Sequence, residues 1–221
     1  VESIALSLRK SVWRTLTGRL MYDLEAQGIG HLAFPPTPSL QPSSGISPET
    51  FRQVCDSCLR ILAEENLLDP SPWNRIHDGW QHHQPTGAAN EGAAKKRIYC
   101  YLVKLAERHR LTLEALRDAV VNAFTSVGHA QAGDRWGVVK LEKLWVRVVK
   151  SDDHAWECVN CGRIHWHASA GICSRCFDVL EKKPNGLTTA KQKEQQHYHA
   201  FEANDKSSAF RIHSEELTGQ S

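Results

Sequence analysis

Apolar residues recur at helical spacing, every three to four positions, in several segments of the chain. Ser47 before Pro48 and Glu49 marks a helix start, because serine caps the first turn, proline fits its first position and a carboxylate favours the positive end of the helix dipole. Thr112 precedes another helical pattern in the same way. We predict helices over residues 3–27, 48–67, 93–109 and 112–127, with a further one over 189–203.

The apolar stripes of the middle three helices predict a shared core. Two cysteines, Cys55 and Cys58, lie on the first of these stripes, which favours packing over a redox or metal role, although their C-x2-C spacing leaves both alternatives open. Cys100 lies in the second helix and is expected to be a buried small apolar residue. The predicted inward residues are Phe51, Val54, Ile61, Leu62, Ile98, Tyr101, Leu102, Leu105, Leu113, Leu116, Val120, Phe124 and Val127.

Residues 136–149 alternate between apolar and polar side chains, as strands do, first across Val139 and Leu141 and then across Leu144, Val146 and Val148. A short buried strand is also predicted at residues 209–213. Two helices followed by strands resemble a winged-helix arrangement. A scaffold that only positions the following segment fits the same pattern.

Composition limits the class of protein. With 221 residues, 41% of them hydrophobic and 24% charged, the chain can form one or two domains with a real core. It contains no apolar run near the roughly 20 residues that span a membrane and no segment that resembles a signal peptide, so we expect a cytoplasmic protein without a membrane partner. Because the sequence begins at Val1 and stops among polar residues, we expect a fragment of a longer chain.

The net charge of +2 is unevenly distributed: residues 1–93 carry −3, residues 94–150 carry +7 and residues 151–221 carry −2. A basic segment attracts phosphates without reading sequence, which makes DNA the expected partner. A solvated helical face without a partner is the alternative. The candidate contacts to DNA are Arg117, Lys140, Lys143 and Arg147 in the basic segment, together with Arg163 further along the chain.

The strongest chemical signal is a pair of C-x2-C motifs, Cys158-Cys161 and Cys173-Cys176, separated by 11 residues. A two-residue gap lets both sulfurs of a pair turn inward, and two such pairs give the tetrahedral set that structural zinc prefers. Gly162 supplies the backbone freedom of the first turn. Four cysteine ligands leave no open position for water, so a catalytic zinc is not expected.

Two other arrangements of these cysteines remain open. The four thiols could form disulfides, although the total of seven cysteines is odd and no signal peptide is recognised. His165 or His167 could replace one cysteine as a ligand. In every case a segment this short and polar needs a crosslink or a metal ion to become ordered.

The run Phe210-Arg-Ile-His213-Ser-Glu-Glu-Leu-Thr-Gly-Gln220 resembles the first strand and following loop of the second RecA-like domain in very large DEAD/DEAH-box superfamily 2 helicases, a group that includes the Druantia-type antiphage defence helicases. The zinc ribbon that precedes it is similar in order to that group. The resemblance implies an ATP-driven DNA translocase as the parent protein, with ATP and Mg²⁺ as cofactors of the intact parent. It also implies the remaining helicase domains as partners.

The chain itself contains no G-x-x-x-x-G-K-[ST] loop and no Asp-Glu box, so it carries no catalytic residues for ATP hydrolysis. We expect an accessory segment in which residues 94–150 grip DNA and the ribbon braces domains. The ribbon's Arg163, His165, Trp166 and Arg175 could instead stack on a base or contact phosphates. The alternative function is a stand-alone zinc-ribbon scaffold or protein-interaction module, with Trp73, Trp80 or Trp166 as exposed anchors.

The predicted fold class is α+β and mainly helical, with a four-cysteine zinc ribbon. Its segments are an N-terminal helix (1–34), a Pro/Ser-rich linker (35–47), a basic helical domain with a winged-helix-like arrangement (48–150), the zinc ribbon (151–183), and a linker helix with the first RecA-like strand (184–221).

Overall fold

A computed structural model describes residues 24–35, 45–64, 68–69, 97–126, 139–140 and 145–185. These residues form an α+β fold, as the sequence predicted, with helices, short strands and one 3-10 turn. The helices are α2 (Pro48–Glu64), α4 (Arg97–His109) and α5 (Leu113–Ser126). The strands are β1 (Gly30–Ala33), β2 (Leu68–Asp69), β3 (Val139–Lys140), β4 (Trp145–Val148), β5 (Trp156–Glu157) and β6 (Ile164–His165), and the 3-10 turn is η3 (Ser169–Gly171).

All three described helices lie within the ranges that the apolar spacing predicted. The predicted cap of α2 is present, because the Ser47 hydroxyl oxygen accepts a hydrogen bond from the Thr50 amide at 3.1 Å. Cys55 and Cys58 of α2 are buried in the apolar core, as expected for packing residues. Cys100 is only partly buried.

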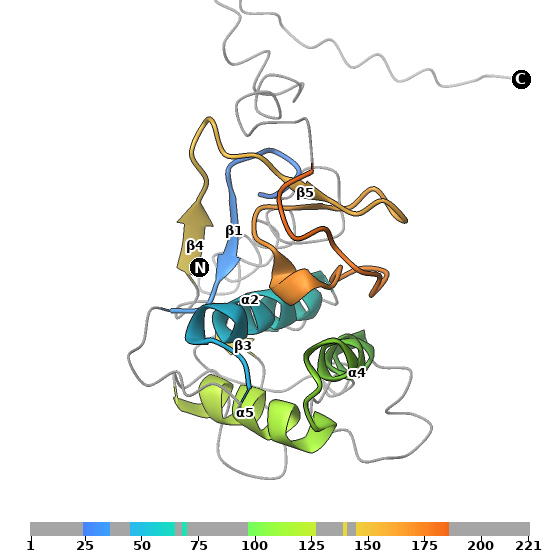
Figure 1. Ribbon diagram of the computed structural model, residues 1–221. Helices are drawn as coiled ribbons and strands as arrows, with labels where there is room; N and C mark the ends of the chain where they lie inside the picture. Colours follow the sequence, from blue (N-terminus) through green and yellow to red (C-terminus); the bar gives the residue numbers. More distant parts are fainter. Residues whose placement is uncertain are drawn as a thin grey trace, which may run out of the picture.

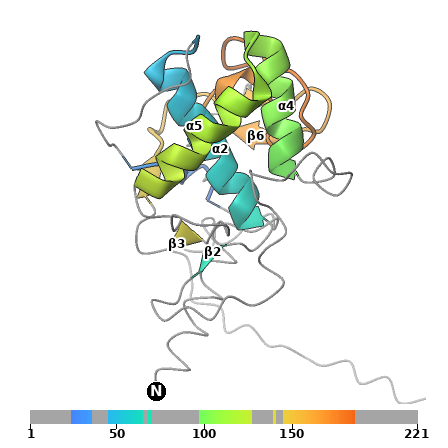
Figure 2. The same cartoon turned by 90° about the horizontal axis from the view of Figure 1, so that it is seen from below.

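Helix α2 lies at the centre of the molecule, with the β1–β4 sheet on one side and α4 and α5 on the other (Figure 1). The view from below shows α5 crossing in front of α2 (Figure 2). Aromatic side chains join these layers, since the rings of Phe34 and Phe124 lie 5.2 Å apart between centroids. Burying each large apolar side chain contributes about 1.5–3 kcal/mol, so this contact region carries much of the stability.

Strand β1 pairs antiparallel with β4, and Gly30 lies opposite Val148. A Cβ atom at Gly30 would lie 2.3 Å from the Arg147 carbonyl oxygen, so only glycine allows the two strands to approach this closely. The predicted apolar face of β4 does not turn inward. Val146 and Val148 are exposed, Val148 by 72%, because β4 is covered on neither face by the described residues.

Strands β2 and β3 pair in parallel, so β3 and β4 have different partners. Within the described residues, β3 and β4 therefore do not form the hairpin that follows the helices in a winged helix. The basic segment nevertheless contains the helical pair α4 and α5, connected by a sharp turn in which Arg110 has a φ of 55°.

The ribbon follows β4 and packs against α2 and α4 (Figure 1). Its hairpin, β5 and β6, pairs Trp156 with His165 in antiparallel register. Ala170 and Ile172 of the ribbon are buried in the same apolar core as the three helices. The ribbon therefore contributes side chains to the helical core and covers part of it.

Several predicted features lie outside the described residues. They are most of the 3–27 helix, most of the 35–47 linker, Trp73, Trp80, Val127, Leu141, Lys143, Leu144, the 189–203 helix, the 209–213 strand and the helicase-like run 210–220. In the part of the chain that the structure describes, no helix is both long and apolar enough to cross a membrane.

Candidate metal centre and its anchoring to the helices

The structure brings together the four cysteines of the two C-x2-C motifs. The Sγ atoms of Cys158, Cys161, Cys173 and Cys176 all lie within 4.8 Å of one another. The closest pairs are Cys158 with Cys176 at 3.4 Å and Cys161 with Cys173 at 3.6 Å. Sulfurs that lie ~2.3 Å from a common zinc ion in a tetrahedron are ~3.8 Å apart, so the four sulfurs fit a single metal ion.

Both cysteine pairs lie on turns of the same form. In the first turn the Gly162 amide donates to the Cys158 carbonyl at 2.8 Å, and in the second the Phe177 amide donates to the Cys173 carbonyl at 3.0 Å. Gly162 and Phe177 each follow the second cysteine of their pair, and both have positive φ values of 66° and 63°. The backbone freedom expected of Gly162 is thus used. Phe177 adopts the same conformation despite its side chain.

The surroundings of the sulfurs control their ionisation. Burial raises the pKa of the Cys173 thiol, although the Cys176 and Arg175 amides donate hydrogen bonds to its sulfur and act in the opposite direction. Burial also raises the pKa of Cys161 to about 12. Burial would raise the pKa of Cys176 too, but the Asp178 amide and the neighbouring thiols lower it overall. A divalent cation would offset the burial cost of the thiolates, because the thiolate is the form that ligates metals.

The sulfurs of this cluster are not joined by disulfide bonds. None of the four cysteines of the cluster forms a disulfide in this structure. Their closest sulfur separations, 3.4 and 3.6 Å, are far longer than the ~2.05 Å of a disulfide bond. The arrangement therefore fits metal ligation.

The two ribbon histidines lie beside the cluster without joining it. His165 Nε2 is 3.4 Å from Cys173 Sγ, and burial lowers the pKa of His165 to about 3, so the neutral ring can donate its N–H to the sulfur. His167 Nδ1 accepts a hydrogen bond from the Ser169 amide at 3.0 Å, and its ring lies 4.7 Å from that of His31. The donor set is therefore the four cysteines.

Two ribbon side chains that the sequence allowed as surface contacts are buried. Trp166 is 6% exposed and donates its indole N–H to the Glu25 carbonyl at 2.8 Å. His165 is 1% exposed. Neither can stack on a nucleic-acid base or anchor a protein interface in this conformation. Trp166 joins the ribbon to the segment before β1, and His165 lies against Cys173 of the cluster.

Hydrogen bonds join the ribbon turn η3 to the helices. The Ser169 hydroxyl bonds the Ser57 hydroxyl at 2.6 Å, and the Tyr101 hydroxyl donates to the Ser169 carbonyl at 3.0 Å. The Ala170 amide donates to Gln53 Oε1, also at 3.0 Å. Ser169 and Ala170 have φ values of 48° and 51°, a conformation that costs about 1–3 kcal/mol per residue and persists where surrounding contacts hold it.

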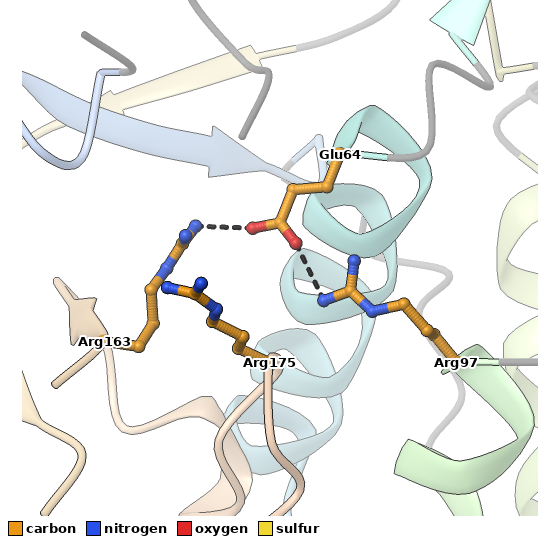
Figure 3. Close-up of a pocket in the computed structure, with 4 residues that line it drawn as sticks. All are labelled: Glu64, Arg97, Arg163 and Arg175. Carbon is orange, nitrogen blue, oxygen red and sulfur yellow. Dashed lines mark hydrogen bonds and ion pairs between the residues drawn. The ribbon is translucent and has the colours of Figure 1, made fainter. Parts of the chain in front are cut away.

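A network of buried and partly buried charges also crosses this boundary. Glu64, at the end of α2, accepts hydrogen bonds from Arg97 Nη2 at 2.7 Å and Arg163 Nη2 at 2.5 Å (Figure 3). It accepts a third from Arg60 Nε at 3.1 Å. Arg60 also pairs with Glu25. Because one carboxylate receives arginines from α2, α4 and the ribbon, Glu64 links all three. We call Glu25, Arg60, Glu64, Arg97 and Arg163 the junction network.

A second buried pair lies where β1 crosses α2. Asp56 Oδ1 accepts the Phe34 amide at 2.6 Å, and Asp56 Oδ2 lies 3.8 Å from His31 Nε2. Burial raises the pKa of Asp56 to about 7 and lowers that of His31 to about 4. Between about pH 4 and 6.5 the pair therefore holds about one proton, on the carboxyl group.

The residues predicted to contact DNA are placed on separate elements. Arg117 on α5 pairs with Asp118 at 2.9 Å, and Arg147 is exposed on β4, so the two lie on opposite sides of α2 (Figures 1 and 2). Arg163 lies in the ribbon and binds Glu64. Lys140 belongs to β3, whereas Lys143 lies outside the described residues.

Sequence reasoning missed the junction network and the His31–Asp56 pair. The only local signal was the spacing of Arg60 and Glu64, four positions apart on one helix face. The other partners are far apart in the sequence, as Arg163 and Glu64 are separated by 99 positions. No pattern within one segment could have joined them.

Comparison with known proteins adds no relative, as no protein-family model, curated protein or solved structure matches the chain. The resemblance of residues 210–220 to superfamily 2 helicases stays a prediction from the sequence.

Proposed function

We propose that this chain is a zinc-stapled structural segment in which Cys158, Cys161, Cys173 and Cys176 hold one zinc ion. The convergence of the four Sγ atoms within 4.8 Å is the observation that carries the proposal. Four sulfur donors in a tetrahedral arrangement favour zinc over harder cations such as Mg²⁺ and Ca²⁺, which prefer oxygen. Four protein ligands would fill the coordination sphere, so the ion would be structural.

The ribbon's role would be to brace the helices. Support comes from its hydrogen bonds to Ser57, Tyr101 and Gln53, and from the ion pair between Arg163 and Glu64. Such contacts transmit force between segments only if the ribbon itself is rigid. A zinc ion would supply that rigidity, since structural zinc contributes roughly 10–16 kcal/mol of apparent binding energy coupled to folding.

We infer that the intact protein is an ATP-dependent superfamily 2 DNA helicase or translocase and that this chain is one of its accessory segments. The sequence of residues 210–220 supports this assignment, and the charge of +7 over residues 94–150 supports a grip on the DNA backbone. The winged-helix-like arrangement belongs to the same proposal, with α4 and α5 as its helices. ATP and Mg²⁺ would act in the parent's motor domains.

A stand-alone scaffold or protein-interaction module is the second candidate. It is favoured by the apolar side chains exposed on β4, where Trp145 is 54% and Val148 is 72% exposed. Aromatic side chains of this kind often anchor protein interfaces. Binding to such a surface should respond little to salt, whereas a grip on DNA should weaken steeply as salt is added.

Metal analysis of the purified chain tests the structural proposal. We expect one zinc ion per chain, and we expect Cys176→Ser to lose it because three thiolates bind zinc far more weakly than four. Cys100→Ser is the matched control, since Cys100 is a cysteine of α4 outside the cluster. Zinc retained at full occupancy in Cys176→Ser would contradict the four-cysteine site.

DNA binding across a salt series tests the helicase proposal. We expect salt-sensitive binding to single-stranded or duplex DNA that is lost when Lys140, Lys143 and Arg147 are changed to glutamate. A control in which the exposed Lys182 and Lys183 are changed to glutamate should retain most of the affinity. Absence of binding at low salt, with one zinc still bound, would favour the scaffold instead.

A further inference from the structure

A cavity of about 260 Å³ opens where the end of α2 meets the start of α4 and the ribbon. It is lined by Glu64, Arg97, Arg163 and Arg175. Figure 3 shows Arg97 of α4, and Arg163 and Arg175 of the ribbon, reaching toward the same carboxylate. The cavity is thus walled by three guanidinium groups around one acidic side chain.

Arginine side chains outnumber carboxylates among the printed contacts at this place. Behind the lining residues, Arg60 binds both Glu64 and Glu25. These six side chains are four arginines and two carboxylates. Like charges held close together in a partly buried site repel one another strongly, and an anion in the cavity would relieve that repulsion.

Arg175 is the side chain that the junction network does not use. Its backbone is fixed by the second cysteine turn, where the Arg175 amide donates to Cys173 Sγ at 3.4 Å. Its side chain lines the cavity and is exposed, and among the described residues it forms no ion pair. Arg97 is fixed as well, because it donates to the Ser174 carbonyl at 3.0 Å in addition to binding Glu64. The cavity is therefore preformed on one side and open to a ligand at Arg175.

We propose that this cavity binds a phosphate group. Arginine's planar fork of N–H donors matches the oxygens of carboxylate and phosphate. Glu64 already provides the carboxylate of this site, and a phosphate monoester, which carries about −1.5 to −2 at pH 7, would bind the guanidinium group of Arg175. A bound phosphate would join Arg175 of the ribbon to Arg97 of α4. This site follows from the cavity and does not depend on the helicase proposal.

Two sources share this chemistry: a free phosphate or nucleotide, and the backbone of a nucleic acid. Both would place phosphate oxygens against Arg175, and binding of either would stabilise the junction by mass action. The probe for the site itself is inorganic phosphate, because it carries the shared group and nothing else.

Calorimetric titration of the zinc-loaded chain with inorganic phosphate, at constant ionic strength, tests the site. We expect saturable binding, and about tenfold weaker binding in Arg175→Gln, the loss expected for one hydrogen bond between charged groups. Lys182→Gln removes the same charge from an exposed ribbon residue outside the cavity and should bind phosphate as the wild type does. Equal affinities for wild type and Arg175→Gln would overturn the proposal.

A second measurement needs no variant, in case Arg175→Gln disturbs the cysteine turn. Guanidinium Nε–Hε resonances in the NMR spectrum of the wild type report directly on each arginine. We expect phosphate to shift the resonance of Arg175, with Arg97 and Arg163 following, while that of Arg117 stays in place. Shifts distributed evenly over all arginines would show non-specific screening and would also overturn the site.

Competition then identifies the source. Single-stranded oligothymidylate that displaces bound phosphate from the wild type, and not from Arg175→Gln, supports the site with a nucleic-acid backbone as its source. Displacement by a nucleoside monophosphate alone supports the site with a small phosphate compound as its source. DNA binding elsewhere on the chain would leave the bound phosphate undisturbed, so failure of this site and failure of the proposed DNA grip give different results.

Discussion

Asp56 and His31 show how burial shifts two neighbouring side chains in opposite directions. Burial raises the pKa of Asp56 from 3.8 to about 7, because the charged carboxylate loses water. Burial lowers the pKa of His31 from 6.5 to about 4 for the same reason. Between pH 4 and 6.5 the folded pair carries one proton on Asp56, and the unfolded chain carries one on His31. The proton counts match, so the intact pair adds little pH dependence to stability.

Asp56→Asn should remove that balance. Asp56 binds a proton more tightly in the folded state, so its contribution to stability is fully present below about pH 4 and is lost as pH rises toward about 7. Relative to the wild type, the variant should therefore gain up to about 4 kcal/mol between pH 4 and 7, at about 1.4 kcal/mol per pKa unit. Urea unfolding at several pH values measures the difference.

His31→Asn should show the opposite slope and serves as the internal control. The pKa of His31 is lowered in the folded state, so its contribution to stability grows as pH rises from about 4 to 6.5. Removing it should make the variant lose up to about 3 kcal/mol relative to the wild type over that range. If the free energies of unfolding of both variants followed the pH dependence of the wild type, neither group would change its pKa on folding.

At the scale of elements, α2, α4 and the ribbon meet at the C-terminal end of α2. Glu64 is buried there and receives Arg60, Arg97 and Arg163. Glu64→Gln keeps the shape of the side chain and removes its charge, which leaves one buried and two partly buried guanidinium groups without their shared anion. We expect a loss of about 3–5 kcal/mol in the free energy of unfolding, the range for breaking one side of a buried ion pair.

Glu107→Gln is the matched control for this prediction. Glu107 lies on the exposed face of α4 and pairs with Lys104 at 2.9 Å, so its loss should cost less than about 1 kcal/mol. Denaturant unfolding of the two variants, side by side, measures both effects. Similar losses for Glu64→Gln and Glu107→Gln would show that water reaches the junction and weakens its charges.

The elements differ in how far the sequence could predict them. Helices α2, α4 and α5 were predicted because their signals are local: an apolar stripe, and at α2 the capping residue Ser47. The cysteine turns were predicted for the same reason. Strand β1 was missed, although residues 29–34 form a short apolar run before Pro35, because its pairing with β4 joins positions such as Gly30 and Val148. The exposure of Val146 and Val148 depends on the same distant pairing.

At the scale of the whole molecule, the ribbon and the helices share one core. Ile172 and Ala170 of the ribbon pack among the apolar side chains of α2, α4 and α5. The Tyr101 hydroxyl of α4 donates to the Ser169 carbonyl, and Arg163 binds Glu64 at the end of α2. A ribbon that loses its order therefore exposes part of the helical core. The stability of the helices should therefore depend on the proposed zinc ion, although none of its four ligands lies on a helix.

Removal of the metal tests this coupling. We expect a strong chelator to abolish protection from hydrogen exchange in residues 156–180 and also to lower protection in α2 and α4, because their buried faces lose Ala170, Ile172 and the bonds to Ser169. Tyr101→Phe is the matched variant, since it removes one hydrogen bond across the boundary and keeps the ring. Before chelation its helices should be slightly less protected than in the wild type, and after chelation the difference should vanish, because the bond to Ser169 no longer exists in either protein. Unchanged protection in α4 after metal removal would show that the helices fold independently and that the ribbon rests on them without bracing them.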